Sequence, residues 1–366
     1  MSVIAFTKRA LRYWRRNRRY WSLAKLANAA VAQAAMHLRM TYNPAMPVVA
    51  KIEATNICNG TCRLCPVGRR QEGRRPLGMM NWDGYCRLID RVARWAHTVD
   101  LTNWGESLLH PRIADMVAYA HRAGLYTYLS TNLHTLGPGQ IDALMTCGLD
   151  ELTLSLHGLS KATYAAYQPG FDFDDACRMI DALLDARRRL GRLEQLKITL
   201  NFVVTAINEH EVGQVESFAR QRGLDWALSE ASLNLRFLVG PQMAQDEPQA
   251  ARQIVAGQAD QWLPKDPTYV RPLYERARRE PSVIHSGRKL VWCDWPWTKL
   301  VVNWDGALSA CCGSFAPGDD VGHDTGQPLR QLWNSPGLRA CRASFRRRQR
   351  PSHADVLCGR CPGVLL

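Results

Sequence analysis

The chain has 366 residues, of which 46% are hydrophobic and 22% are charged, and its formal net charge is +14. This composition is enough to build a sizeable core and excludes a wholly disordered chain. No apolar run approaches the ~20 residues of a membrane span, so we do not expect an integral membrane protein.

Most of the positive charge lies at the N-terminus, where residues 1–47 predict a basic helical arm. The first 50 residues hold nine Lys or Arg and no Asp or Glu, which leaves only +5 for the remainder. Four aromatic residues are interleaved with these cations: Tyr13, Trp14, Tyr20 and Trp21. The pattern suits nucleic acid, anionic lipid or an acidic redox partner. We favour a solvated helix face whose aromatic rings pack on the domain behind it.

The same arm does not resemble a secretory signal. Its most apolar stretch, residues 23–38, is interrupted by a lysine and by amide side chains. A signal peptide has an unbroken apolar segment at this point. We therefore expect a cytoplasmic protein.

Six short apolar runs follow the arm and predict six strands. Between most of them the apolar residues have helical spacing, which predicts alternating βα units and a parallel sheet of the α/β class. The runs are 48–57, 99–103, 125–131, 151–156, 196–204 and 225–229. Periodicity alone leaves open an incomplete barrel or a doubly wound sheet. In both, ligands bind at the C-terminal ends of the strands.

The last third of the chain divides into two parts. Residues 236–289 are rich in Gln, Pro and Arg and predict a helical or irregular bridge. Residues 290–366 are dense in Trp, Gly and Cys and predict a small module. Within it, residues 300–303 and 307–310 flank an Asn-Trp-Asp-Gly turn and predict a β-hairpin.

Twelve cysteines are too many for ordinary core packing in a reducing compartment, where clustered thiols more often bind metal. Cys58, Cys62 and Cys65 form a tight group directly after the first predicted strand. Thiolates are ligands for iron–sulfur clusters and for zinc. Three of them would leave one iron of a four-iron cluster open, whereas a structural zinc site needs a fourth ligand from a distant part of the chain.

This C-x3-C-x2-C group on the loop after the first strand resembles the radical S-adenosylmethionine (SAM) superfamily. Further strand-end segments match that family: Asn103-Trp104-Gly105-Glu106-Ser107, Ser130-Thr131-Asn132 and Ser155-Leu156-His157-Gly158. The resemblance covers about residues 48–230. It implies a partial (β/α)6 TIM-like barrel for residues 48–235 and a first [4Fe–4S] cluster held by Cys58, Cys62 and Cys65.

The resemblance also implies which residues bind SAM. The expected contacts come from Leu64 and from the strand-end positions Gly105, Glu106, Ser107, Ser130, Asn132, Ser155 and His157. Three positions depart from the family pattern. Leu64 stands where an aromatic residue is usual, Trp104 replaces a glycine, and His157 replaces an aspartate.

A second cysteine group resembles the SPASM or "twitch" auxiliary-cluster module of radical SAM enzymes. The resemblance implies one auxiliary [4Fe–4S] cluster on Cys293, Cys311, Cys358 and Cys361. The chain ends five residues beyond Cys361, so we do not expect a second auxiliary cluster. A zinc ribbon is the alternative. Cys312, next to Cys311, is either a packing residue or a thiol that donates hydrogen to the substrate.

These resemblances imply a radical SAM oxidoreductase that uses SAM and two [4Fe–4S] clusters. A 5′-deoxyadenosyl radical would abstract hydrogen from the substrate, with electrons from an acidic flavodoxin or ferredoxin. The layout is similar to that of aminocyclitol (2-deoxy-scyllo-inosamine) dehydrogenases, which favours oxidation or epimerisation of a small polar metabolite in natural-product biosynthesis. The first alternative is a maturase of a ribosomally made peptide. The alternative from another class is a non-catalytic zinc protein that binds nucleic acid.

Overall fold

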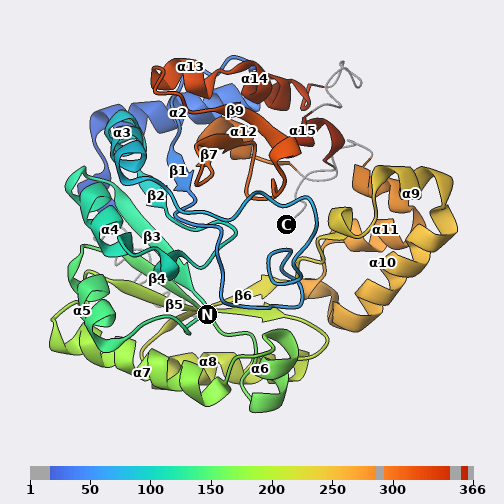
Figure 1. Ribbon diagram of the computed structural model, residues 1–366, viewed down its shortest axis with the longest axis horizontal. Coiled ribbons are helices and arrows are strands. Elements are labelled where there is room, and N and C mark those ends of the chain that lie inside the picture. The colour runs from blue at the N-terminus through green and yellow to red at the C-terminus, as the bar shows by residue number, and fades with distance from the viewer. Residues whose placement is uncertain (1–16, 286–291, 347–355, 362–366) are drawn as a thin grey trace.

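The computed structural model describes residues 17–285, 292–346 and 356–361 (Figure 1). Tyr13, Trp14 and the cations before Asn17 lie outside the described residues, as does the start of the predicted C-terminal module. Among the residues that are described, no helix is both long and apolar enough to cross a lipid bilayer.

One nine-stranded sheet organises the molecule, in the order β6-β5-β4-β3-β2-β1-β7-β8-β9. The first six strands are parallel and follow one another in chain order, so each is joined to the next by a helical crossover. Their bounds are β1 (Val49–Ile52), β2 (Thr98–Asp100), β3 (Tyr126–Thr131), β4 (Glu151–Ser155), β5 (Lys197–Val204) and β6 (Asp225–Glu230). The curved sheet is open, because β6 and β9 are its two edges (Figure 1). This confirms the predicted partial barrel.

The helices between the strands cover the outer face of the curve (Figure 1). They are α3 (Trp82–Val92), α4 (Ile113–Arg122), α5 (Pro138–Thr146), α6 (Lys161–Tyr167), α7 (Phe173–Arg189) and α8 (Val212–Gln221). The longest, α7, begins at the N-cap Asp172, whose carboxylate accepts from the Asp175 N–H. Its first turn is acidic and its last turn carries three arginines, which suits both ends of the helix dipole.

Alternation along the strands separates an apolar face from a polar one. Leu152 and Leu154 on β4 belong to the main core, in which the outer helices also take part. Thr153 and Ser155 alternate with these leucines along β4. Both lie opposite polar residues on the neighbouring strands. Because side chains alternate along a strand, these polar residues lie on the concave face.

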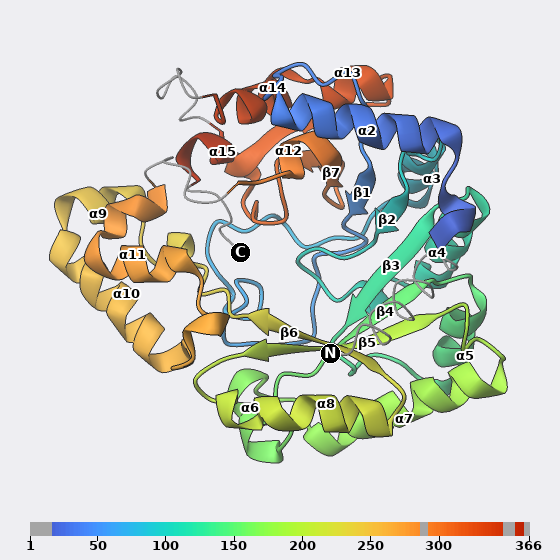
Figure 2. The same ribbon diagram turned by 180° about the vertical axis from the view of Figure 1, so that it is seen from behind.

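The predicted bridge is helical: it contains α9 (Pro241–Asp246), α10 (Pro248–Trp262) and α11 (Pro272–Arg279). These helices form a separate smaller core beside β6 (Figures 1 and 2).

The predicted hairpin is also present, as β7 (Lys299–Val302) and β8 (Ala307–Ser309), and β7 pairs in parallel with β1. Sequence analysis missed a third strand, β9 (Asp320–His323), since its four residues include a glycine and have no apolar run. The rest of the module consists of α12 (Trp295–Thr298), α13 (Leu329–Trp333), α14 (Pro336–Ala343) and α15 (Leu357–Arg360).

The described end of the N-terminal arm packs on the opposite end of the barrel from the strand C-termini. The Tyr20 hydroxyl donates to the buried Asp150 carboxylate, which Arg19 also contacts at 2.8 Å. The Trp21 ring lies 4.3 Å from the ring of His97. Tyr20 and Trp21 therefore pack on the domain, as the favoured interpretation of the arm predicts. The helix α2 (Leu23–His37) follows.

Candidate active site

The first cysteine group lies on the loop after β1, where its three thiols are buried together. Burial raises the pKa of Cys58 to about 11 and that of Cys62 to about 12. The charge of Cys65 contributes to both shifts, and that of Cys58 to the second, so the three sulfurs are mutual neighbours. Thiols with such raised pKa values stay protonated at pH 7. They become thiolates only when a cationic centre, such as a metal cluster, compensates for their charge.

Backbone N–H groups also donate to two of these sulfurs, and such hydrogen bonds tune the potential of iron–sulfur clusters. The Gly60 N–H donates to Cys58 Sγ at 3.4 Å. The N–H groups of Val67 and Gly68 lower the pKa of Cys65, although burial outweighs them. The donor set therefore fits a cluster held by three thiolates.

Two glycines allow the cysteine loop to pack tightly. A Cβ on Gly68 would lie 2.5 Å from the backbone nitrogen and oxygen of Cys62. A Cβ on Gly105, after β2, would lie 2.2 Å from the carbonyl oxygen of Thr55. Any side chain at either position would force the cysteine loop away from its neighbours.

Glu106 joins the ends of two strands. Its carboxylate accepts from the Leu108 N–H at 3.2 Å and from the Asn132 N–H at 2.8 Å. Burial raises its pKa to about 7, against the lowering effect of these donors. The predicted SAM contact Ser107 is likewise engaged, because its hydroxyl donates to the Leu101 carbonyl. Both side chains hold the loop after β2 in place.

The remaining predicted contacts lie at the ends of β3 and β4. The hydroxyls of Ser130 and Ser155 are 3.4 Å apart across the two strands. The Asn132 amide donates to Asn59 Oδ1 at 2.7 Å and also lowers the pKa of Cys58. Of these residues, Asn132 contacts the cysteine loop, and Ser130 and Ser155 lie beside each other; their binding of SAM remains a prediction.

Two of the family departures have clear local explanations. The Nδ1 atom of His157 accepts from the Val203 N–H at 3.2 Å, and burial lowers the pKa of this histidine to about 4, so it is neutral at pH 7. Leu64 is 2% exposed and packs in the smaller core with Tyr167 and Leu233. Its side chain offers almost no surface to a ligand, so the expected packing of Leu64 against SAM has no support here.

The second cysteine group assembles from distant parts of the C-terminal module. The charges of Cys358 and Cys361 contribute to the raised pKa of both Cys293 and Cys311, so all four thiols are neighbours. Burial is the main cause, and it raises the pKa of Cys293 to about 12. The Gly313 N–H donates to Cys311 Sγ at 3.3 Å. This set fits a cluster with four protein ligands. In the described parts of the chain, no three His, Cys, Asp or Glu side chains are arranged around a single metal-ion position.

Cys312 faces a different group from Cys311. Burial raises its pKa to about 11, and the nearby charges are those of Lys51 and Asp100 inside the barrel, with Lys299 beside them. Lys51 Nζ donates to Asp100 Oδ2 at 2.6 Å. Cys312 therefore lies near Lys51 and Asp100, and it is also close enough to Cys311 for its charge to raise the pKa of that thiol.

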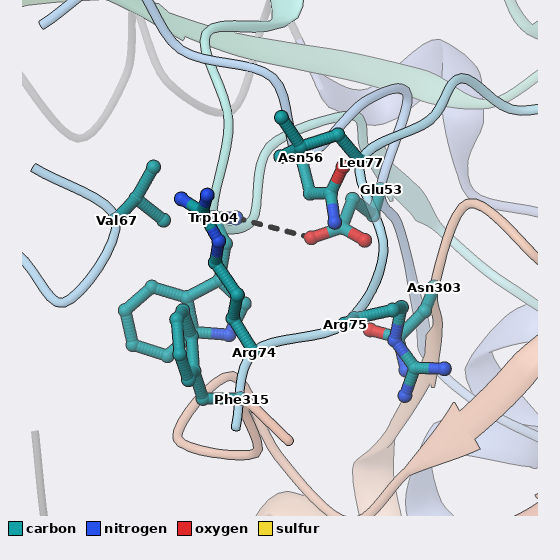
Figure 3. A pocket seen from close by; sticks show the side chains of 9 residues that line it. All are labelled: Glu53, Asn56, Val67, Arg74, Arg75, Leu77, Trp104, Asn303 and Phe315. Atoms are coloured by element: carbon teal, nitrogen blue, oxygen red, sulfur yellow. Dashed lines mark hydrogen bonds between the residues drawn. The ribbon is translucent and has the colours of Figure 1, made fainter. Parts of the chain in front are cut away.

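A small pocket lies between the cysteine loop and the C-terminal module (Figure 3). Its lining residues are Glu53, Asn56, Val67, Arg74, Arg75, Leu77, Trp104, Asn303 and Phe315. Glu53 is buried and accepts from the N–H groups of Trp104 and Trp304, both at 3.3 Å. Sequence analysis missed Glu53, because the predicted first strand continues through it to residue 57, whereas β1 ends at Ile52.

The third departure, Trp104, connects the two halves of the molecule at this pocket. Its indole N–H donates to the Ser314 carbonyl at 2.6 Å, and its ring meets Phe315 edge-on at 5.3 Å. Arg75 adds a second connection through ion pairs to Asp305 and Asp320. The position that is glycine in the family pattern therefore anchors the module here.

Comparison with known proteins agrees with this geometry. Residues 52–216 match the radical SAM superfamily, and residues 293–362 match the SPASM iron–sulfur-cluster-binding domain. The domain limits that we expect, 48–235 and 290–366, are somewhat wider and remain predictions.

Two curated relatives carry the same printed name, PqqA peptide cyclase. The one from Gluconobacter oxydans is 25% identical over 259 residues, 68% of each chain. The one from Ruegeria pomeroyi is 33% identical over 168 residues, 43% of this chain and 44% of that protein. The chain thus matches about two thirds of the first relative and less than half of the second.

The solved structure of Streptococcus suis SuiB bound to its precursor peptide SuiA has the same fold. It aligns over 88% of this chain and 72% of its own, with 14% identity and a TM-score of 0.60. The narrower resemblance to aminocyclitol dehydrogenases is not confirmed, because both of these curated relatives are named peptide cyclases. The chain carries a radical SAM domain followed by a SPASM domain, and its cofactors are SAM and [4Fe–4S] clusters.

Proposed function

We propose that this protein is a radical SAM maturase that modifies a ribosomally made peptide. The observation that carries the proposal is the alignment with a PqqA peptide cyclase, which spans 68% of both chains. The fold shared with SuiB, a protein solved with a precursor peptide, agrees with it. The proposal replaces our first expectation, a small polar metabolite, as the favoured substrate class.

Several charged and polar side chains of the concave face are already paired with one another, which agrees with this preference. A small polar metabolite needs polar groups that are free to bind it. Here Lys51 is paired with Asp100, Lys197 is paired with Glu151 at 2.6 Å, and Tyr128 donates to Thr153 at 3.0 Å. Internal pairs satisfy these groups, so they do not favour such a ligand.

The chain supplies two groups of cysteines, with a small pocket between the cysteine loop and the C-terminal module. Cys58, Cys62 and Cys65 would hold the SAM-binding cluster, and the SPASM cysteines would hold the auxiliary cluster. When bound, SAM and its cluster supply a radical able to take hydrogen from an unactivated C–H bond. The pocket between the two groups presents the exposed Arg74 and the rings of Trp104 and Phe315 (Figure 3).

The test supplies anaerobically reconstituted protein with SAM, dithionite and short peptides encoded beside its gene. We expect one peptide to lose two hydrogen atoms, detected by mass spectrometry, while 5′-deoxyadenosine accumulates. The variant with Cys58, Cys62 and Cys65 all changed to alanine is the control and should leave the peptide unchanged. If every peptide stays intact while an aminocyclitol or sugar is oxidised, the proposal is wrong.

A further inference from the structure

The helix α2 has an unusual distribution of polar and apolar residues. Its buried side carries Lys25 and Asn28, both of which have partners in the domain. Lys25 Nζ donates to the Gly124 carbonyl at 2.7 Å, and the Asn28 amide exchanges hydrogen bonds with the backbone of Met46 at 2.7 and 3.0 Å. These polar contacts fix the orientation of the helix on the domain. They therefore determine which residues of α2 face outward.

The outward face of α2 is mostly apolar, with Gln33 and His37 as its exposed polar residues. Leu23 is 86% exposed, Leu26 is 50% exposed and Val31 is 42% exposed, and just beyond the helix Leu38 is 72% exposed. Exposed alanines at positions 27, 30 and 34 fill the intervals. Of the nine large hydrophobic residues that are exposed in the described parts of the chain, five lie between residues 23 and 42. Single exposed leucines are ordinary, whereas a continuous stripe marks a contact surface.

Positive charge flanks this stripe, which we call the α2 stripe (Leu23, Leu26, Val31 and Leu38). Arg18 and Arg19 precede it, and five further cations lie before Asn17 in the sequence. Arg39 follows it and lies 5.1 Å from the ring of Trp292, which is itself exposed. Asp150 balances the charge of Arg19, but the first 50 residues contain no acidic side chain to balance the other cations. Figure 2 shows α2 on the outer surface, away from the C-terminal ends of the strands.

We propose that the α2 stripe and the cations beside it dock the protein on an anionic lipid surface. A helix with leucines on one face, tryptophan nearby and flanking arginines lies in the plane of the headgroups and inserts its apolar side. The fifteen residues of α2 would place about 22 Å of helix along the membrane. This association is peripheral and requires no spanning segment.

The positive charge beside the α2 stripe favours an anionic lipid surface over a second copy of the chain as the partner. A symmetric contact between two α2 stripes would place the cationic flanks of one copy near those of the other, with no acidic residue in the first 50 to compensate. An anionic bilayer can bind both the apolar stripe and the neighbouring cations, because the burial of apolar side chains and the attraction of cations to the headgroups both stabilise the bound state.

The test is co-sedimentation of the full-length protein with vesicles. We expect binding to phosphatidylcholine vesicles that contain phosphatidylglycerol, weaker binding without it, and loss at high salt. Changing Leu23, Leu26 and Leu38 together to glutamine should weaken binding about tenfold or more. The thermal midpoint should stay unchanged, since these side chains are already exposed. Leu193→Gln, at another leucine that is 48% exposed, is the matched control and should bind normally.

Three results would overturn the proposal. The first is that anionic vesicles bind no protein, and the second is that the triple variant binds as well as the parent. The third is a dimer in sedimentation velocity that the triple variant loses, because the stripe would then cover itself with a second copy. None of these outcomes depends on the substrate, so failure here leaves the proposed function standing.

Discussion

The two cysteine groups of this molecule are built in opposite ways. Cys58, Cys62 and Cys65 come from one loop of eight residues, whereas the other four thiols come from three separate segments of the C-terminal module, with Cys358 and Cys361 together at α15. Three ligands leave one corner of a four-iron cluster accessible, and four close it. The local loop is therefore suited to binding SAM, and the closed group to transferring electrons and holding the module together.

The largest expected effect comes from removing the local group. Changing Cys58, Cys62 and Cys65 together to alanine should abolish formation of 5′-deoxyadenosine with dithionite, because no thiolate remains to hold the SAM-binding cluster. About half of the iron should remain, on the auxiliary cysteines. Iron analysis and chromatography of the reaction measure the two quantities. If the triple variant still cleaves SAM, the SAM-binding cluster is held by other residues.

Removing the closed group should separate SAM cleavage from product formation. Cys358→Ala combined with Cys361→Ala should also lose about half of the iron. The protein should still form 5′-deoxyadenosine, because the first loop is intact, but it should form little modified peptide. Loss of both activities in a variant that remains folded by circular dichroism would contradict the division of roles.

The third prediction concerns the packing that holds the SAM-binding loop. Gly105→Ala should destabilise the protein by about 1–3 kcal/mol and slow SAM cleavage, since the new Cβ would lie 2.2 Å from the Thr55 carbonyl oxygen. Gly213→Ala in α8 is the matched control, because a Cβ there meets no atom within 4 Å. It should be neutral or slightly stabilising. Thermal unfolding compares the two, and equal midpoints would refute the close approach.

The smallest effect is expected at Cys312, which lies near Lys51 and Asp100 and is not one of the four expected cluster ligands. Cys312→Ala should keep the full iron content and unchanged SAM cleavage. Cys311→Ala, one residue away, should lose auxiliary iron. If Cys312→Ala alone abolishes an epimerised product while SAM is still cleaved, Cys312 is the hydrogen donor that the sequence leaves open.

Sequence reasoning succeeded where the signal is local. The strand ends, the hairpin and the spacing of Cys58, Cys62 and Cys65 are each visible within a short window, and the structure places the strands within a few residues of the predicted runs, except for the first, which ends at Ile52 instead of residue 57. The auxiliary group was accessible only through a resemblance, since its members meet through tertiary packing.

The features that sequence reasoning missed depend on contacts between distant segments. Trp104 looks like an unexplained departure until Ser314 and Phe315 lie against it. Glu53 gains its role from the backbone of Trp104 and Trp304, which no periodicity connects to β1. The strand β9 is too short and too polar to predict from its own residues. It is extended because it pairs with β8.

Electron paramagnetic resonance of the reduced protein, recorded with and without SAM, tests the central claim most directly. We predict signals from two clusters, of which SAM alters one, and this component should be missing from the variant that lacks Cys58, Cys62 and Cys65. Colourless protein loaded with zinc, or a signal that still responds to SAM in that variant, would contradict the assignment of an open iron site to this loop.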